Sequence, residues 1–203
     1  MYGRRRAQPA WRQDLRPAAV LSLPTPIGEL FVAACEDGVV ASSFDERGFM
    51  LEVAQCGFEA VFLGAPAEAE ALAGAAREEL KRYFDGTPRN FSVPVELGRQ
   101  TEFSRAVLEE TAAIPYGETV TYAEIGERAG RLRAARAVGN ILASCPFNVI
   151  VPCHRVVHAL PTADEVVSAQ GSPSRKAWLL QFERTTKQSG SRLKHDAQAL
   201  PSP

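Results

Sequence analysis

The chain has 203 residues, of which 45% are hydrophobic and 23% are charged, and its formal net charge at pH 7 is −1. This length and apolar content can bury a normal core in one or two domains. The near-neutral charge excludes a uniformly basic coat protein for nucleic acid. No segment has the apolar run of a signal peptide or membrane span, so we expect a cytoplasmic protein without a membrane partner, nucleoid-associated in a prokaryote.

The first hundred residues divide into an arm, a sheet region and a helix. Residues 1–17 contain five arginines and two prolines against one aspartate, which predicts a flexible basic arm. Residues 18–63 alternate short apolar runs with turn signals, a pattern typical of a small antiparallel meander. An amphipathic helix follows, with apolar positions at Leu72, Ala76, Leu80 and Tyr83. We expect an N-terminal α/β domain over residues 18–90, with residues 87–102 linking it to a second domain.

Two short helices are predicted between residues 121 and 144. Thr121-x-x-Glu124 is a capping box, which indicates the start of a helix, and Gly130 supplies a C-terminal stop. The second helix covers roughly residues 133–144, and one face of it carries Ala134, Val138, Ile141 and Leu142. The opposite face carries Arg133, Arg136, Gly139, Asn140 and Ala143. This arrangement predicts a helix-turn-helix, whose second helix normally meets DNA.

Local charge supports the same interpretation. Residues 128–157 contain five arginines and no aspartate or glutamate, although the whole chain is almost neutral. Clustered arginines are typical of phosphate contacts, so double-stranded DNA is the expected partner. The alternative is a solvated helical face with no partner.

Another feature of the sequence is a cysteine next to a histidine, Cys153 and His154. The β-branched run Val149–Val151 predicts a short buried strand, and Pro152 ends it, so Cys153 is expected at a rigid turn. A thiol is nucleophilic only as the thiolate, and His154 or a neighbouring arginine could promote its formation. The alternative is a buried cysteine with a structural role.

The chain has four cysteines and no secretory signal, which indicates reduced thiols rather than a disulfide framework. A zinc site is conceivable from Cys145, Cys153, His154 and His158. Their spacing fits no common structural zinc pattern. We therefore expect neither a metal nor another cofactor.

Residues 103–157 resemble the active-site domain of the O6-alkylguanine-DNA alkyltransferases. The matching motifs are Ile-Pro-Tyr-Gly-Glu-Thr at 114–119, Ala-Ala-Arg-Ala-Val-Gly at 134–139 and Ile-Val-Pro-Cys-His-Arg-Val-Val at 150–157. Looser matches are Thr-Pro-Ile-Gly at 25–28, Tyr-Phe-Asp-Gly at 83–86, and the closing-helix residues Lys176, Trp178, Leu179, Leu180 and Glu183.

The resemblance implies an α/β fold in two parts. A small ribonuclease-H-like N-terminal domain, with an antiparallel sheet and helix, precedes a mainly helical domain with a winged helix-turn-helix. The second domain would span residues 101–185 and hold the active site and the DNA-binding surface. Residues 186–203 lack periodicity and are expected to form a disordered tail.

The resemblance also implies a chemistry. Cys153 would take the alkyl group from an O6-alkylguanine, and possibly an O4-alkylthymine, that is flipped out of the duplex. The resulting thioether is stable, so each molecule would act once if the chain resembles the methylated-DNA–protein-cysteine methyltransferases in activity, and we expect it to act as a monomer. His154 would take the thiol proton through water, and Glu183 would orient the imidazole.

The remaining assignments concern DNA and the pocket. By resemblance, Arg136 fills the space left by the base, while Tyr122 protonates guanine N3 and crowds the 3′ phosphate. Further DNA contacts are assigned to Arg131, Arg133, Gly139 and Asn140. The substrate pocket is assigned to Tyr122, Cys145 and Val156.

Two departures from the family pattern leave other functions open. Cys145 stands where the family has an asparagine, and residues 158–171 lack the tyrosine of the family's pocket loop. One alternative is an alkyltransferase-like protein that flips or flags the lesion without transfer, although such proteins typically have tryptophan in place of the cysteine. The other is a helix-turn-helix regulator or a metal-dependent structural protein.

Overall fold

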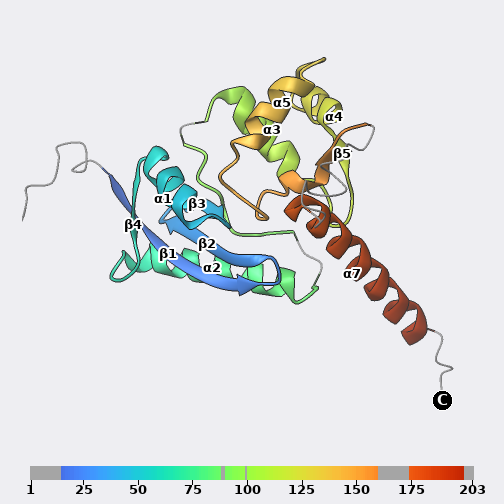
Figure 1. Ribbon diagram of the computed structural model, residues 1–203, viewed down its shortest axis with the longest axis horizontal. Coiled ribbons are helices and arrows are strands. Elements are labelled where there is room, and N and C mark those ends of the chain that lie inside the picture. The colour runs from blue at the N-terminus through green and yellow to red at the C-terminus, as the bar shows by residue number, and fades with distance from the viewer. Residues whose placement is uncertain (1–14, 88–89, 99, 160–173, 199–203) are drawn as a thin grey trace, which may run out of the picture.

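The computed structural model describes residues 15–87, 90–98, 100–159 and 174–198 of the chain (Figure 1). The N-terminal half contains the strands β1 (Arg16–Thr25), β2 (Gly28–Cys35), β3 (Gly38–Ser43) and β4 (Phe58–Val61), in the order β3-β2-β1-β4. The first three form the expected antiparallel meander, whereas β4 pairs parallel to β1. Strand β1 already begins inside the range expected to be a flexible arm; residues 1–14 lie outside the described residues.

Helices cover both faces of this sheet. Alternate residues of β1 point to opposite faces, so Ala18 packs with the cluster around α1 (Glu46–Gln55) and Ala19 with that around α2 (Ala67–Phe84). Helix α1 was not predicted. Its local signal is Asp45, which caps the helix by accepting a hydrogen bond from the Arg47 amide at 3.2 Å.

The C-terminal half is mainly helical. Its helices are α3 (Glu102–Ala112), α4 (Tyr122–Arg128), α5 (Ala135–Ala143) and α7 (Arg175–Gln198), with a 3₁₀ turn η2 (Cys153–Arg155). The two-residue strands β5 (Val120–Thr121) and β6 (Val156–Val157) pair in parallel and join the start of α4 to the end of η2. The predicted capping box at Thr121 and Glu124 is present, with both of its reciprocal hydrogen bonds.

The predicted strand at Val149–Val151 is wrong. These residues are buried, but they form turns, and Val149 adopts a left-handed φ of 71°. The conformation is held across the fold, because the backbone N–H and side-chain Nδ2 of Asn148 both donate to the Ser42 carbonyl, at 3.0 and 2.9 Å. Distant hydrogen bonds thus override the local β preference.

The expected disordered tail also needs correction, because α7 continues as helix to Gln198. Its extension packs on the loop after α3. Tyr116 and Thr186 share a hydroxyl hydrogen bond of 2.7 Å, and Lys187 pairs with Glu118 at 3.2 Å. Residues 199–203 lie outside the described residues.

One hydrophobic core runs through both halves. The largest buried cluster includes Leu30 and Tyr83 from the N-terminal half together with Ile125, Val138 and Val156 from the C-terminal half. Backbone hydrogen bonds also cross the junction, from the Val39 amide to Pro94 and from the Ser42 amide to Pro146. Gly38 allows this approach, because a Cβ there would lie 2.7 Å from the Pro94 carbonyl oxygen. Within the described ranges, no helix is long and apolar enough to cross a membrane.

Candidate active site

Cys153 is half-buried at the start of η2, directly after Pro152. Its amide donates to the Val151 carbonyl at 2.7 Å, which fixes the turn that carries the thiol. The thiol lines a cavity of about 250 Å³. Other lining residues come from α4, α5, the turn before η2, η2 itself and α7, and include Tyr122, Gly139, Asn148, His154 and Lys176. A small molecule or a single base can therefore reach the thiol.

The imidazole of His154 is buried at the cavity wall. Its Nε2 lies 2.8 Å from the Glu183 Oε1 atom. Burial lowers the pKa of His154, although Glu183 opposes this effect, so the ring is neutral near pH 7. An ionised carboxylate only accepts hydrogen bonds, so Nε2 carries the proton and Nδ1 keeps a free lone pair. His154 is therefore arranged to accept a proton.

Glu183 is the buried centre of a polar network. The Arg155 Nε atom donates to both of its oxygens, at 3.2 and 3.0 Å, and the Tyr83 hydroxyl and the Gly117 amide each donate at 2.8 Å. Burial alone would raise the pKa of Glu183, but the hydrogen bonds from His154 and Arg155 lower it to about 2. The carboxylate thus stays ionised at every physiological pH.

The nucleophile has a second thiol as its neighbour. A hydrogen bond with the Cys145 side chain, followed by burial, raises the pKa of Cys153 well above that of a free cysteine. Lys176 acts in the opposite direction through its charge. At rest, Cys153 is therefore a thiol, and it requires a base when it reacts.

Tyr122 stands at the edge of the cavity as the first residue of α4. The Lys176 ammonium group donates to the Tyr122 hydroxyl at 3.3 Å and to the Val156 carbonyl at 2.7 Å. The His158 ring lies against Tyr122, with the ring centroids 4.8 Å apart. These contacts hold the phenol in place over the cavity.

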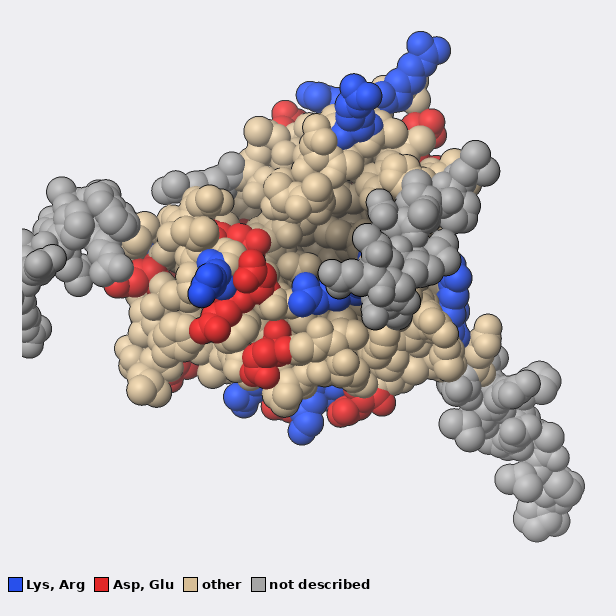
Figure 2. Space-filling view, in the orientation of Figure 1, with Lys and Arg blue, Asp and Glu red and all other residues tan. Residues whose placement is uncertain are grey.

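A basic surface extends from the cavity along α4 and α5. Arg128, Arg131, Arg133 and Arg136 are all exposed. In Figure 2, basic side chains project from the part of the molecule that Figure 1 identifies as the α4–α5 region. The Arg131 guanidinium is held over the Phe103 ring, 4.3 Å from its centroid. Asn140 is exposed, and Gly139 has nothing within 4 Å of an added Cβ, so another molecule can approach this helix closely.

The residues expected from the sequence gather at this site, with two differences. Among the described residues, the cavity lining does not include Cys145 or Val156, which contribute a contact to the thiol and a carbonyl to Lys176 instead. Sequence reasoning gave no role to Tyr83 or Lys176. It expected Arg155 to promote the thiolate or to contact phosphate, but Arg155 is buried, with only 2% exposure, and binds Glu183 instead. Its signal in the sequence is its position directly after the Cys-His pair. The tyrosine-less loop falls mainly in residues 160–173, outside the described residues.

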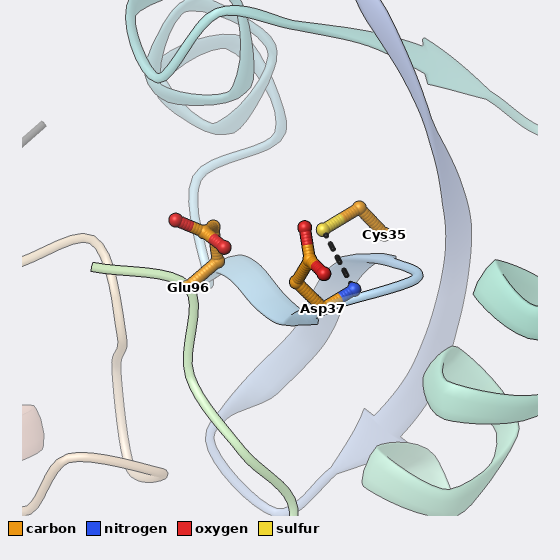
Figure 3. A group of neighbouring side chains, drawn as sticks. All are labelled: Cys35, Asp37 and Glu96. Atoms are coloured by element: carbon orange, nitrogen blue, oxygen red, sulfur yellow. Dashed lines mark hydrogen bonds between the residues drawn. The ribbon is translucent and has the colours of Figure 1, made fainter. Parts of the chain in front are cut away.

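A group of potential metal ligands lies elsewhere. Cys35, Asp37 and Glu96 place their ligand atoms within 4.8 Å of one another at the β2–β3 turn (Figure 3). Each already has a partner: the Cys35 sulfur accepts from the Asp37 amide, Asp37 pairs with Arg16, and Glu96 accepts from the Gly98 amide. In the part of the chain that the structure describes, the zinc ligands considered above (Cys145, Cys153, His154, His158) form no such group.

Comparison with known proteins matches the chain both to models of protein domains and to individual relatives. Residues 21–97 match the ribonuclease-like domain of 6-O-methylguanine DNA methyltransferase, and residues 102–185 match its DNA-binding domain. The chain is 35% identical to the methylated-DNA–protein-cysteine methyltransferase of Mycobacterium leprae, over 80% of this chain and 90% of that protein. It is 33% identical to the DNA base-flipping protein of Thermus thermophilus, over 79% of this chain and 97% of that protein.

Solved structures agree with these matches. The crystal structure of Mycobacterium tuberculosis OGT in complex with DNA superposes with a TM-score of 0.62 and 28% identity, over 83% of this chain and 94% of that chain. The matched ranges include both halves of the fold and every residue of the cavity named above. The chain therefore belongs to the 6-O-methylguanine DNA methyltransferase family.

Proposed function

We propose that this protein repairs DNA by transferring the alkyl group of an O6-alkylguanine directly and irreversibly to Cys153. The observation that carries the proposal is a thiol at the wall of a base-sized cavity, beside a histidine on the same wall whose Nε2 lies 2.8 Å from the buried carboxylate of Glu183. Relatives of the chain include proteins named methylated-DNA–protein-cysteine methyltransferase, and a similar structure, Mycobacterium tuberculosis OGT, is solved in complex with DNA. The enzyme would act as a monomer and bind double-stranded DNA.

The reaction begins with the thiol proton. His154 accepts it at Nδ1 through a water molecule, and the Glu183 carboxylate stabilises the imidazolium that forms. The Cys153 sulfur then attacks the alkyl carbon, and a carbon–sulfur bond forms as the bond between that carbon and guanine O6 breaks. The electron pair stays on the guanine, which takes up a proton at N3 from Tyr122. Cys153 is left as a thioether.

Base extrusion would depend on α4 and α5. Arg136 would occupy the space left in the stack, and Tyr122 would crowd the 3′ phosphate so that the nucleotide rotates into the cavity. Arg131 and Arg133 would bind phosphates on either side. The open space beside Gly139 and the exposed side chain of Asn140 would let the duplex approach α5. Cys145 and Val156 would contribute to the pocket from behind its lining.

The second candidate function is lesion binding without transfer. The observation that favours it is the match to a DNA base-flipping protein over nearly that protein's whole length. Both functions use the same basic surface and cavity, so only the chemistry at Cys153 separates them.

Intact-mass spectrometry tests the proposal. After incubation with a duplex that contains O6-methylguanine, we expect a gain of about 14 Da, one methylene, located on Cys153. Cys153→Ser should gain nothing, and Cys56→Ser, a matched change in the N-terminal half, should gain as much as the wild type. An unmodified Cys153 in protein that binds the lesion duplex would favour the base-flipping function instead.

A further inference from the structure

The turn between α4 and α5 presents an apolar side chain to solvent. Leu132 is 79% exposed, and its two neighbours along the chain are arginines. Single exposed apolar residues are common on protein surfaces, so exposure alone carries no meaning. The surroundings of Leu132 decide its role.

The turn is rigid. Gly130 takes a left-handed φ of 82°, and the Arg131 amide donates back to the Gly126 carbonyl at 2.8 Å, which closes the end of α4. Arg133 also has a positive φ, 59°, which is unfavourable for a residue with a side chain and persists only where the surrounding structure imposes it. Leu132 is therefore held out by a preformed backbone rather than by a loose loop.

The charge around Leu132 identifies the partner. Arg131 and Arg133 flank it in the chain, Arg128 and Arg136 are exposed on the two helices that the turn joins, and residues 128–157 contain no acidic side chain. An apolar tip between cationic side chains suits a duplex, in which phosphates flank a groove floored by sugars and base edges. Apolar wedges of this kind enter the minor groove, separate base steps and bend the DNA.

The position of Leu132 on the fold separates it from the flipped base. The face of α5 that carries Arg136 and Ala143 leads to the cavity, and the helix rise of about 1.5 Å per residue puts these two residues roughly 10 Å apart along the axis. Leu132 precedes α5, at the end away from Ala143 and the cavity. It would meet the duplex beside the extruded nucleotide, not at it.

We propose that Leu132 is an apolar wedge that enters the minor groove of the bound duplex and stabilises the bent form from which the nucleotide is extruded. Arg131 and Arg133 bind the phosphates on its two sides. The proposal rests on the proposed function for its DNA partner, but it does not require alkyl transfer.

The test measures binding with the full chain carrying Cys153→Ala, so that no transfer takes place. Affinity for a lesion-bearing duplex is measured by fluorescence anisotropy across a salt titration, and bending by energy transfer between dyes at the duplex ends. Leu132→Asn should weaken binding about tenfold and reduce the bend, with an unchanged dependence of log K on log salt, because no counterion contact is lost. Leu132→Met should bind as the parent does.

Two control variants separate the effect of an apolar wedge from the effect of a neighbouring charge and from that of an exposed leucine elsewhere on the surface. Arg133→Gln should instead reduce the salt slope by about one phosphate contact. Leu63→Asn, at a residue 92% exposed in the N-terminal half, should change nothing. Unchanged affinity and bend in Leu132→Asn, an equal loss in Leu63→Asn, or a parent chain that binds no duplex would each overturn the proposal. Failure of the proposed function would appear separately, as an unmodified Cys153 in the wild type.

Discussion

Glu183 is the residue on which the chemistry of the site depends most. Its carboxylate binds the imidazole of His154 and the guanidinium of Arg155, and no part of its side chain is exposed. A buried charge is tolerated only with good partners, and here the ion pair and three further donors provide them. The same bonds fix the His154 tautomer, so the residue that stabilises the network also directs the proton path.

The thiol pair leads to a prediction about pH. Because the Cys145 hydrogen bond raises the pKa of Cys153, Cys145→Ala should lower that pKa. The thiolate would then be available at lower pH, so the rate of reaction with free O6-benzylguanine should rise at lower pH than in the wild type. Rates measured between pH 6 and 9 check this shift. Cys56→Ala, in the N-terminal half, should leave the profile unmoved, and a wild-type profile in Cys145→Ala would contradict the assignment.

Among the elements, α4 and α5 could be predicted from the sequence and the turn before η2 could not. A capping box is a local signal, because it depends on residues within four consecutive positions, and Thr121 and Glu124 form it as expected. The conformation of Val149 depends on Asn148 and Ser42, which are 106 residues apart. Periodicity also cannot show that Tyr83 contacts Glu183, because that hydrogen bond joins two helices 100 residues apart.

The capping box can be tested at the scale of its helix. Thr121→Ala removes the acceptor for the Glu124 amide, so the free energy of unfolding should fall by about 1 kcal/mol. DNA affinity should fall as well, because Tyr122 begins α4. Urea denaturation and duplex binding measure the two effects. Thr101→Ala, which removes the corresponding cap of α3, should cost similar stability and leave DNA binding intact. Equal binding losses in both variants would indicate a global effect.

At the scale of the whole molecule, the two halves share one core. The residues that separate them in sequence, 90–98, contribute an isolated β-bridge between Val39 and Val95. The ring centroid of Phe84 lies 6.4 Å from those of both Trp178 and Phe182. The division into domains at residues 90 and 101 remains a prediction, although two family models meet near it. Folding of either half alone would expose much of this shared surface.

We therefore expect a single cooperative unfolding transition. In a Trp11→Phe variant, Trp178 is the only tryptophan, and it reports on the C-terminal half. Its fluorescence and the far-ultraviolet circular dichroism should give the same midpoint in urea. Tyr83→Phe removes a buried hydrogen bond between the halves. It should lower the free energy of unfolding by about 1–2 kcal/mol, and so lower the midpoint, without splitting the transition. Two separate midpoints in the parent would contradict a shared core.

The network at Glu183 has a consequence for protein engineering. The Pro-Cys-His-Arg segment looks portable, since four consecutive residues hold the nucleophile and its base. Yet the carboxylate that orients the base comes from α7, and one of the donors that keep it in place is Tyr83 of α2. Grafting the segment onto another DNA-binding scaffold would transplant a cysteine without its activation, unless the acceptor supplied a buried, ionised carboxylate of its own.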